Sequence, residues 1–265
     1  MEQPELDARL QAYYTDEFVE AERLTTRSAQ GRLELERVQE VVRGLIPAGS
    51  RVVDVGGATG VHAAALAAAG YDVVLVDPVP AQVAQAARVG TFRAVVGDAR
   101  RLEVEDDWAD AALLLGPLYH LASRADRLTA LREAARVVRP GGWVVAAAIP
   151  RLARLTSMLT ARGLPPVSTH EWTALLERGD PTAFGRFPGG HFHTAQELAD
   201  ELTDAGLDDV EVFAVEGPDG FAFEQLAEVD EEAHQAASLL ARRFGHLPRV
   251  RDLSPHVLAV GRVRE

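Results

Sequence analysis

Residues 51–60 read RVVDVGGATG, in which an apolar run ends in a glycine-rich turn. The stretch that follows, VHAAALAAAG at 61–70, is alanine-rich and of helical length. Glycine lacks a Cβ and tolerates positive φ, so such a turn lets backbone and a helix N-terminus approach a ligand closely. The same kind of turn also serves as a tight strand-to-helix connection that binds nothing. The surrounding sequence must decide between these two interpretations.

Short apolar runs alternate with helical stretches from residue 51 to about residue 149. The runs stand at 51–55, 72–77, 92–96, 110–115 and 143–149. The helical stretches between them end near glycine or before the turn at 139–142, which we expect to start the last of these strands. This alternation is typical of a parallel α/β sheet, and strands this apolar are buried on both faces.

Helical segments flank this core on both sides. Residues 5–46 predict one or two helices, and capping boxes at Ser168/Glu171 and Thr194/Glu197 predict two further helix starts. A longer helix, roughly 224–244, has its apolar face formed by Leu226, Val229, Ala236 and Leu240. Strands are expected at 209–215 and 255–263. We therefore expect an N-terminal helical lid at 1–47, a ligand-binding core at 48–150, a helical cap at 151–192, and the rest of the core at 193–265 with a helical insertion at about 217–248.

Composition removes several classes of chemistry and partner. The 27 basic residues are all arginine, against 40 acidic ones, and Lys, Asn and Cys are absent. The chain therefore has no thiolate nucleophile and no lysine Schiff base. A net charge of −13 with dispersed arginine argues against binding nucleic acid. No run of 18 apolar residues and no signal peptide is present, so we expect a cytoplasmic protein without a membrane span.

The spacing of the glycines separates two families of nucleotide binder. A dinucleotide fingerprint would need glycine at 56, 58 and 61, but Val61 occupies the third position. The pattern present is acidic-x-Gly-x-small-x-Gly, formed by Asp54, Gly56, Ala58 and Gly60. It resembles the first motif of the class I S-adenosylmethionine-dependent methyltransferases, with alanine in place of the middle glycine.

The resemblance continues in order through residue 142. Asp77 and Pro78 end the second strand, where the family's acidic residue accepts hydrogen bonds from the ribose hydroxyls. The turn at 96–100 resembles the adenine-contacting turn, with Asp98 accepting from the exocyclic amine. The strand and exit loop at 110–121 and the turn at 136–142 also match. Taken singly, Asp77 with Pro78 could cap a turn, and Asp98 could form an Asx-turn.

This resemblance implies a fold, a cofactor and a set of cofactor contacts. The fold is Rossmann-like, with a seven-stranded, mostly parallel sheet, helices on both faces, an antiparallel last strand, N-terminal helices and a helical cap insertion. The cofactor is S-adenosyl-L-methionine, which becomes S-adenosyl-L-homocysteine. The implied contacts are Asp54, Gly56, Gly57, Ala58, Gly60, Asp77, Pro78, Asp98, Ala99, Arg100, Leu115, Gly116 and Tyr14.

Three short segments resemble a subgroup of small bacterial methyltransferases. They are the loop Gly-Pro-Leu-Tyr-His-Leu at 116–121, a Leu-Glu-x-x-Arg segment to which 35–37 is close, and Glu-Gly-Pro at 216–218. Six aromatic residues outside the strands either pack small helices or form an apolar lid over a substrate. They are Trp172, Phe184, Phe187, Phe192, Phe221 and Phe223.

Methyl transfer from a sulfonium is an in-line displacement that needs orientation and, for a hydroxyl acceptor, a base. Tyr119 and His120 are the first candidates, with packing on the methionine moiety and a structural histidine as the alternative. His191 and His193 are the second pair, and His193 is the candidate acid or base. A His-x-His pair can bind metal, but no third ligand stands at a convincing spacing, so no metal site is predicted. His62 is expected to be a helix-face or core residue.

The leading hypothesis is methyl transfer to a small-molecule acceptor of hydrophobic or aromatic, secondary-metabolite-like character. O-methylation is slightly favoured over N- or C-methylation. The alternatives are an NAD(P)-dependent oxidoreductase and a non-catalytic protein that binds S-adenosylmethionine as a regulator. We expect a monomer or homodimer with neither nucleic-acid nor membrane partners.

Overall fold

A single seven-stranded sheet organises the chain, of which the computed structural model describes residues 2–17, 20–160, 168–183 and 187–265. The strand order is β3-β2-β1-β4-β5-β7-β6. The first five strands pair in parallel, and β7 runs antiparallel to both β5 and β6. This confirms the predicted sheet. The strands are β1 Arg51–Val55, β2 Asp72–Asp77, β3 Arg93–Val96, β4 Ala109–Leu114, β5 Val138–Ala148, β6 Leu207–Ala214 and β7 Val257–Val263.

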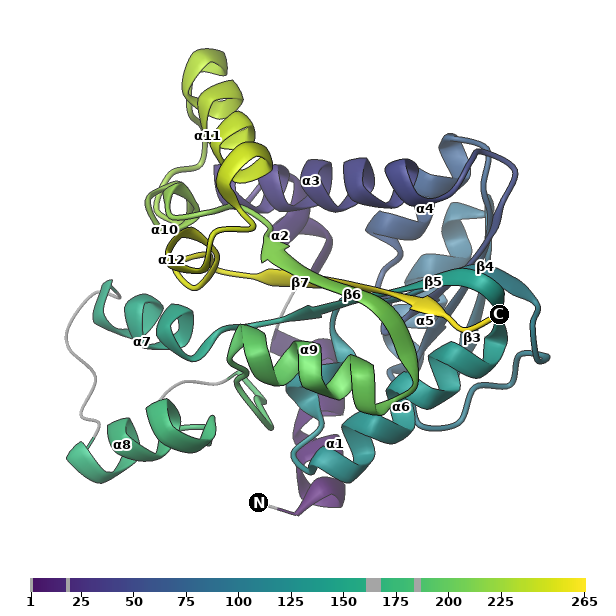
Figure 1. Cartoon of the computed structure of the whole chain (residues 1–265), viewed down its shortest axis with the longest axis horizontal. Helices are drawn as coiled ribbons and strands as arrows, with labels where there is room; N and C mark the ends of the chain where they lie inside the picture. The colour runs from purple at the N-terminus through teal and green to yellow at the C-terminus, as the bar shows by residue number, and fades with distance from the viewer. Residues whose placement is uncertain (1, 18–19, 161–167, 184–186) are drawn as a thin grey trace.

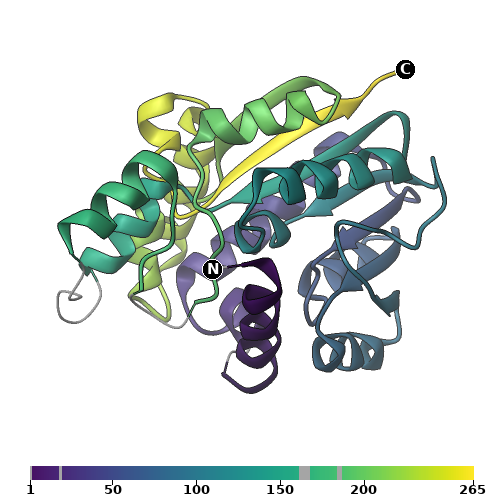
Figure 2. The same cartoon turned by 90° about the horizontal axis from the view of Figure 1, so that it is seen from below.

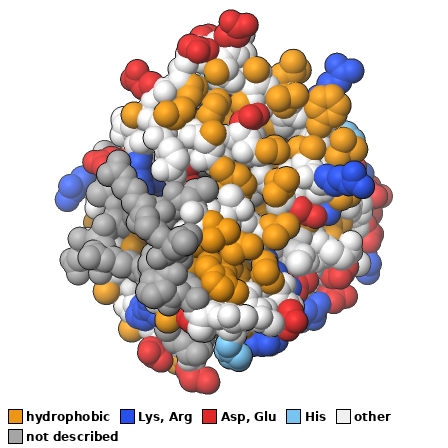
Figure 3. All heavy atoms as spheres, turned by 90° about the vertical axis from the view of Figure 1, so that its left-hand side faces the viewer, with side chains coloured by type: hydrophobic (Ala, Val, Ile, Leu, Met, Phe, Trp, Pro, Cys, Tyr) orange, Lys and Arg blue, Asp and Glu red, His pale blue; other side chains and the backbone are white. Residues whose placement is uncertain are grey.

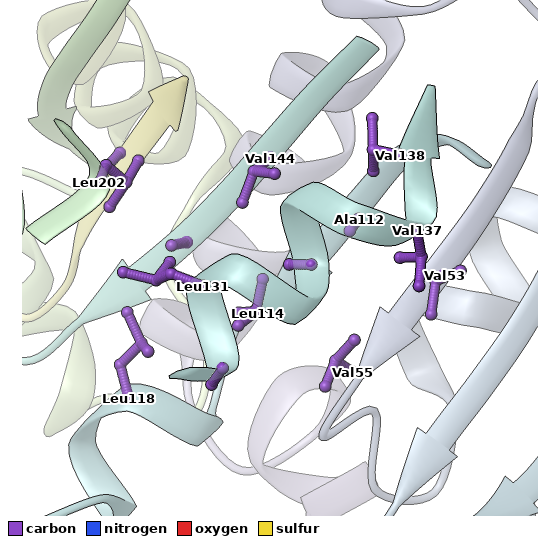
Figure 4. Close-up of a cluster of buried hydrophobic side chains, with 14 of the residues drawn as sticks. Val53, Val55, Ala112, Leu114, Leu118, Leu131, Val137, Val138, Val144 and Leu202 are labelled. Carbon is purple, nitrogen blue, oxygen red and sulfur yellow. The ribbon is translucent and has the colours of Figure 1, made fainter. Parts of the chain in front are cut away.

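Helices cover both faces of the sheet (Figure 1). One face packs against α3 (Ala29–Leu45), α4 (Val61–Ala68) and α5 (Pro80–Ala86). The other packs against α6 (Arg124–Val137) and α9 (Ala195–Asp204). Figure 4 shows how side chains of β1, β4 and β5 meet those of α6 in this second layer. Both faces are therefore dry, which explains why the central strands are continuous apolar runs.

β5 begins earlier than predicted. It starts at Val138, ahead of the turn at 139–142, and its pairing with β4 shifts register between Ala109 and Ala111. The expected turn is thus an irregularity inside a long strand, and the regular part runs from Trp143 to Ala148.

The N-terminal segment is more divided than the predicted one or two helices. It comprises α1 (Gln3–Ala12), a π-helical turn (Tyr13–Glu17), α2 (Glu20–Thr25) and α3. Figure 2 places α1 between the cap helices and the α5 side of the core. Ser28 caps α3 by accepting a hydrogen bond from the Gly31 amide at 3.2 Å.

The cap contains α7 (Arg151–Thr160) and α8 (Thr169–Arg178), and Phe184 lies outside the described residues. Both capping boxes form as predicted. Single-turn 3-10 segments lie at Ala87–Val89 and Pro117–His120. No helix among the described residues is long and apolar enough to cross a membrane. The division into lid, core, cap and insertion stays a prediction.

The predicted helix at 224–244 is wrong in extent and in its buried face. The chain forms α10 (Asp219–Glu224), α11 (Glu231–Phe244) and α12 (Pro248–Arg251), and Asp230 caps α11 by accepting from the Ala233 amide. The inner face of α11 carries Ala237 and Ala241, whereas Leu240 is 46% exposed. Alanines form the inner face because small side chains let helices approach closely, and the leucines point outward.

Candidate functional site

A cavity of about 280 Å³ lies at the C-terminal ends of β1, β2 and β4. In open parallel sheets this is where strand order reverses and where ligands bind. The helix α1 and the turn after it cover the cavity through Asp7, Leu10, Gln11 and Tyr14. Of the thirteen predicted cofactor contacts, all but Gly60 line the cavity. The motifs quoted from the sequence therefore meet at one place.

The glycine-rich loop has a conformation that only small residues tolerate. Gly56 and Gly60 have φ of +71° and +82°, and Ala58 has φ of +48°. A Cβ on Gly60 would stand 2.4 Å from Phe92 Cζ, so this glycine shapes the loop without lining the cavity. The Ala58 amide donates to Asp77 Oδ2 at 2.9 Å, which ties the loop to the end of β2.

Asp54 is a buried acid aimed at this loop. Its side chain sits in a residue only 1% exposed, and Oδ2 has no hydrogen-bond partner among the described residues. Burial, aided by the nearby Asp77 carboxylate, raises the pKa of Asp54 to about 7. A buried oxygen without a donor is costly, so it indicates that a ligand donor completes the site.

Asp77 and Gln82 form the next wall. Asp77 Oδ1 accepts a hydrogen bond from the Val79 amide at 2.8 Å, and Oδ2 accepts one from the Ala58 amide. The Asp77 side chain therefore fixes two backbone segments and also lines the cavity. Gln82 donates to the Tyr14 carbonyl at 2.5 Å, while its own Oε1 has no partner in the described part of the chain. The wall thus offers acceptors to a ligand with neighbouring hydroxyl groups.

Asp98 forms the Asx-turn that the sequence left as an alternative. Its Oδ1 accepts from the Arg100 amide at 2.8 Å, and the Arg100 guanidinium holds the carboxylate through further hydrogen bonds. These contacts outweigh burial and keep the pKa of Asp98 below its usual value. Arg100 also reaches Asp7 of α1 at 3.2 Å, so this turn holds the lid in place.

Tyr119 and His120 border the cavity together with Tyr14. The His120 Nδ1 lies 2.8 Å from the Pro188 carbonyl, and Nε2 lies 3.1 Å from the Tyr14 hydroxyl. A carbonyl only accepts, so Nδ1 carries the proton and Nε2 accepts from Tyr14. Burial lowers the pKa of His120 to about 4, although the bond to Pro188 opposes this. Phe187 packs against the imidazole with ring centroids 5.2 Å apart.

His191 and His193 do not line the cavity. His193 is fully buried, and its Nε2 lies 3.2 Å from Glu201, which also accepts three hydrogen bonds from Arg127. Burial lowers the pKa of both imidazoles, that of His191 to about 3. The predicted role of this pair as acid, base or substrate donor therefore gains no support from its position. The pair links the cap segment to α6 and α9.

Sequence reasoning missed two residues of the inner cavity wall, Arg23 and Glu34. His62 is buried on α4, as expected for a helix-face or core residue, and it also lines the cavity beside them. Arg23 binds both oxygens of Glu34. The sequence contains a signal for this wall, because Leu33-Glu34-x-x-Arg37 has the full Leu-Glu-x-x-Arg spacing. The segment 35–37, which we compared with that motif, begins two residues too late.

A buried network supports Glu34 from behind. Glu216 accepts from Gln30, from Ser254 and from the His256 backbone amide. His256 Nδ1 lies 2.7 Å from Glu216 and 3.5 Å from Glu34. Ligand atoms of Glu34, Glu216 and His256 lie within 4.8 Å of one another. These ligand atoms already take part in hydrogen bonds and ion pairs with one another and with Gln30 and Ser254. The cluster therefore supports the site structurally.

Comparison with known proteins identifies the domain. Residues 53–146 match the model of a methyltransferase domain family. Over 106 residues the chain is 39% identical to an uncharacterized methyltransferase of Mycobacterium tuberculosis, a match that covers 39% of this chain and 42% of that protein. The chain thus matches less than half the length of this curated relative.

Solved structures extend the likeness to the whole fold. An S-adenosylmethionine-dependent methyltransferase of Thermotoga maritima, described as a possible histamine N-methyltransferase, superposes with a TM-score of 0.61 at 18% identity, covering 97% of this chain and 99% of that one. The [4+2]-cyclase SpnF has a TM-score of 0.54 at 20% identity, covering 86% and 81%. At such identities these structures establish the fold alone.

Proposed function

We propose that the chain is a class I S-adenosylmethionine-dependent methyltransferase that methylates a small-molecule acceptor, since residues 53–146 match a methyltransferase domain family. The observation that carries the proposal is the cavity in which twelve of the thirteen predicted cofactor contacts meet. A fold shared with a cyclase does not by itself specify methyl transfer, so the argument depends on the side chains of this cavity.

The cavity residues fit S-adenosylmethionine in charge and in hydrogen bonding. The acceptors on Asp77 and Gln82 suit the two ribose hydroxyls. Asp54 and Arg23 supply opposite charges at the glycine-rich end, which suits the ammonium and carboxylate of an amino-acid tail. Asp98 is held by Arg100, so we assign Asp98 to shaping the adenine-side turn. When bound, the cofactor supplies an electrophilic methyl group on a sulfonium.

Tyr14 and His120 are the residues proposed to handle the acceptor's proton. His120 is neutral at pH 7, with its Nε2 lone pair directed to the Tyr14 hydroxyl. An acceptor hydroxyl bound beside Tyr14 could pass its proton to the phenol oxygen as the phenol proton moves to Nε2. This arrangement favours O-methylation. Tyr119 and Phe187 surround the imidazole with aromatic surface, which favours a hydrophobic or aromatic acceptor.

Calorimetry separates the candidate functions first. We expect S-adenosylmethionine to bind and NADH not to bind, and the reverse result would favour an oxidoreductase. Incubation with labelled S-adenosylmethionine and a panel of phenols, amines and carbon acids then separates an enzyme from a non-catalytic binder. Transfer of label to an acceptor supports the proposal, whereas binding without transfer to any acceptor supports the regulatory alternative.

Two variants test the proton pathway once an acceptor is known. His120→Ala is expected to lower kcat by about 10²–10⁴-fold, with a much smaller change in cofactor affinity, because it removes the base alone. Tyr14→Phe keeps the ring and removes the hydroxyl that relays the proton. It should therefore also lower kcat much more than it changes cofactor affinity. His234→Ala is the matched control, since this histidine pairs with Glu36 away from the cavity. Unchanged turnover in His120→Ala would exclude the assignment.

A further inference from the structure

The helix α11 projects from the body of the molecule (Figure 1) and has two different faces. Its inner face packs through Ala237 against Ala29, Leu33 and Phe223, a small cluster separate from the sheet core. Its outer face carries exposed leucines among polar residues. Leu239 is 56% exposed and Leu240 is 46% exposed, although burial of either would remove considerable apolar surface from water.

The outer face has an ordered pattern of charge and size. Glu232, Ala236, Leu239 and Arg243 are all exposed, and their spacing of four, three and four residues places them in one stripe along the helix. Within the described part of the chain, neither Glu232 nor Arg243 forms an ion pair, and the Arg243 guanidinium lies over the Phe244 ring, 5.6 Å from its centroid. By contrast, the neighbouring Arg242 pairs with Glu40 at 3.0 Å.

We propose that this stripe binds a second copy of the chain, with the two α11 helices antiparallel about a two-fold axis. An axis midway between Ala237 and Ser238 places Glu232 opposite Arg243 of the partner subunit. The same axis places Ala236 opposite Leu239 of the partner subunit, so a small side chain faces a large one. The stripe is therefore self-complementary in both charge and size, which a two-fold interface requires.

The helix dipole alone does not account for the pattern. It favours acids in the first turn and bases in the last turn of any helix, but it does not favour exposed leucines between them. Phe244, the last residue of α11, and Leu247 beyond it are 39% and 42% exposed, so further apolar surface lies near the C-terminal end of the helix. Figure 3 shows hydrophobic side chains on the side of the molecule that lies to the left in Figure 1, with acidic ones at its upper end. Because the stripe comprises four residues of one helix, we expect a weak interface of less than about 1,200 Å² in total.

Light scattering coupled to size-exclusion chromatography tests the proposal on the full chain, at concentrations up to about 100 μM because weak interfaces need them. The expected result is a mass approaching twice 28.6 kDa. Glu232→Arg and Arg243→Glu each place like charges opposite one another at both ends, so each variant should be monomeric. The double reversal restores the pairing and should regain the dimer.

Circular dichroism verifies that each variant is folded, and Leu253→Glu is the matched control. Leu253 is 45% exposed and lies after α12, so this variant should remain dimeric. A monomeric wild type over the whole concentration range would overturn the proposal. So would a dimer that survives both single reversals, or a folded double reversal that stays monomeric. None of these outcomes depends on methyl transfer.

Discussion

Asp54→Asn is expected to abolish a proton release that accompanies cofactor binding. In the ligand-free protein, burial and Asp77 raise the pKa of Asp54 to about 7. A ligand cation beside this carboxylate favours its charged form, so binding near neutral pH requires Asp54 to lose its proton. The asparagine has no proton to lose and presents no charge to the ligand.

The pKa sets the size of the effect. Each pH unit below about 7 costs about 1.4 kcal/mol for deprotonation, which corresponds to a tenfold weaker affinity. Between pH 8 and pH 6 the Kd for S-adenosylmethionine should therefore rise by about tenfold. At pH 6 close to one proton should be released for each molecule bound.

The same pKa also affects the stability of the ligand-free protein. Because the pKa of Asp54 is higher in the folded state than its unfolded value of 3.8, its protonation stabilises the folded protein. This stabilisation is complete below pH 3.8 and is lost as pH rises through about 7. Asp54→Asn should therefore stabilise the ligand-free protein by up to about 4 kcal/mol at pH 8, and by little at pH 4.

Titration calorimetry at pH 6 in two buffers of different ionisation enthalpy measures the released proton directly. The wild type should give a buffer-dependent enthalpy and the variant should not. A buffer-independent enthalpy in the wild type, or an equal dependence in both proteins, would refute the reasoning about Asp54.

Three further changes follow from other contacts. Glu201→Gln should cost about 3–5 kcal/mol in urea unfolding, because the buried Arg127 guanidinium loses its charged partner; a cost below about 1 kcal/mol would contradict this. Gly60→Ala should weaken S-adenosylmethionine binding at least about tenfold by calorimetry, because a residue with a Cβ strains the glycine-rich loop at a φ of +82°. Burial lowers the pKa of His256, but the Glu34 and Glu216 carboxylates outweigh burial and raise this pKa to about 9. The stabilisation by the charged imidazole holds below pH 6.5 and is lost as pH rises through about 9, so the melting temperature should fall there, and less so in Glu216→Gln.

The core could be predicted because its signals are local. Strands buried on both faces read as apolar runs, and capping boxes such as Ser168 with Glu171 are written within four residues. The motif residues meet because each follows a parallel strand, and the carboxyl ends of such strands share one edge of the sheet. The family resemblance named these residues, and the shared edge of the sheet explains why they lie together.

The inner wall of the site was only partly predictable, because Leu33-Glu34-x-x-Arg37 is visible in the sequence but its place beside the cavity is not. Arg23 and Glu34 belong to helices that precede the first strand, and only the packing of α3 brings them to the cavity. The burial of His193 likewise depends on Glu201 and Arg127, which lie on two different helices. No pattern within one segment encodes such a meeting of three segments.

The misassigned face of α11 has a different cause. Periodicity favoured the leucine side, yet the chain buries the alanine side and leaves Leu240 exposed. Hydrophobic periodicity reports which face avoids water in the assembled protein, without specifying whether the covering surface belongs to the same chain. If the outer stripe pairs with a second copy, Ala236, which belongs to both the predicted apolar face and the stripe, is buried against that copy, whereas Val229 packs within its own chain. The light-scattering experiment on Glu232 and Arg243 therefore also tests whether the exposed side of α11 is an interface.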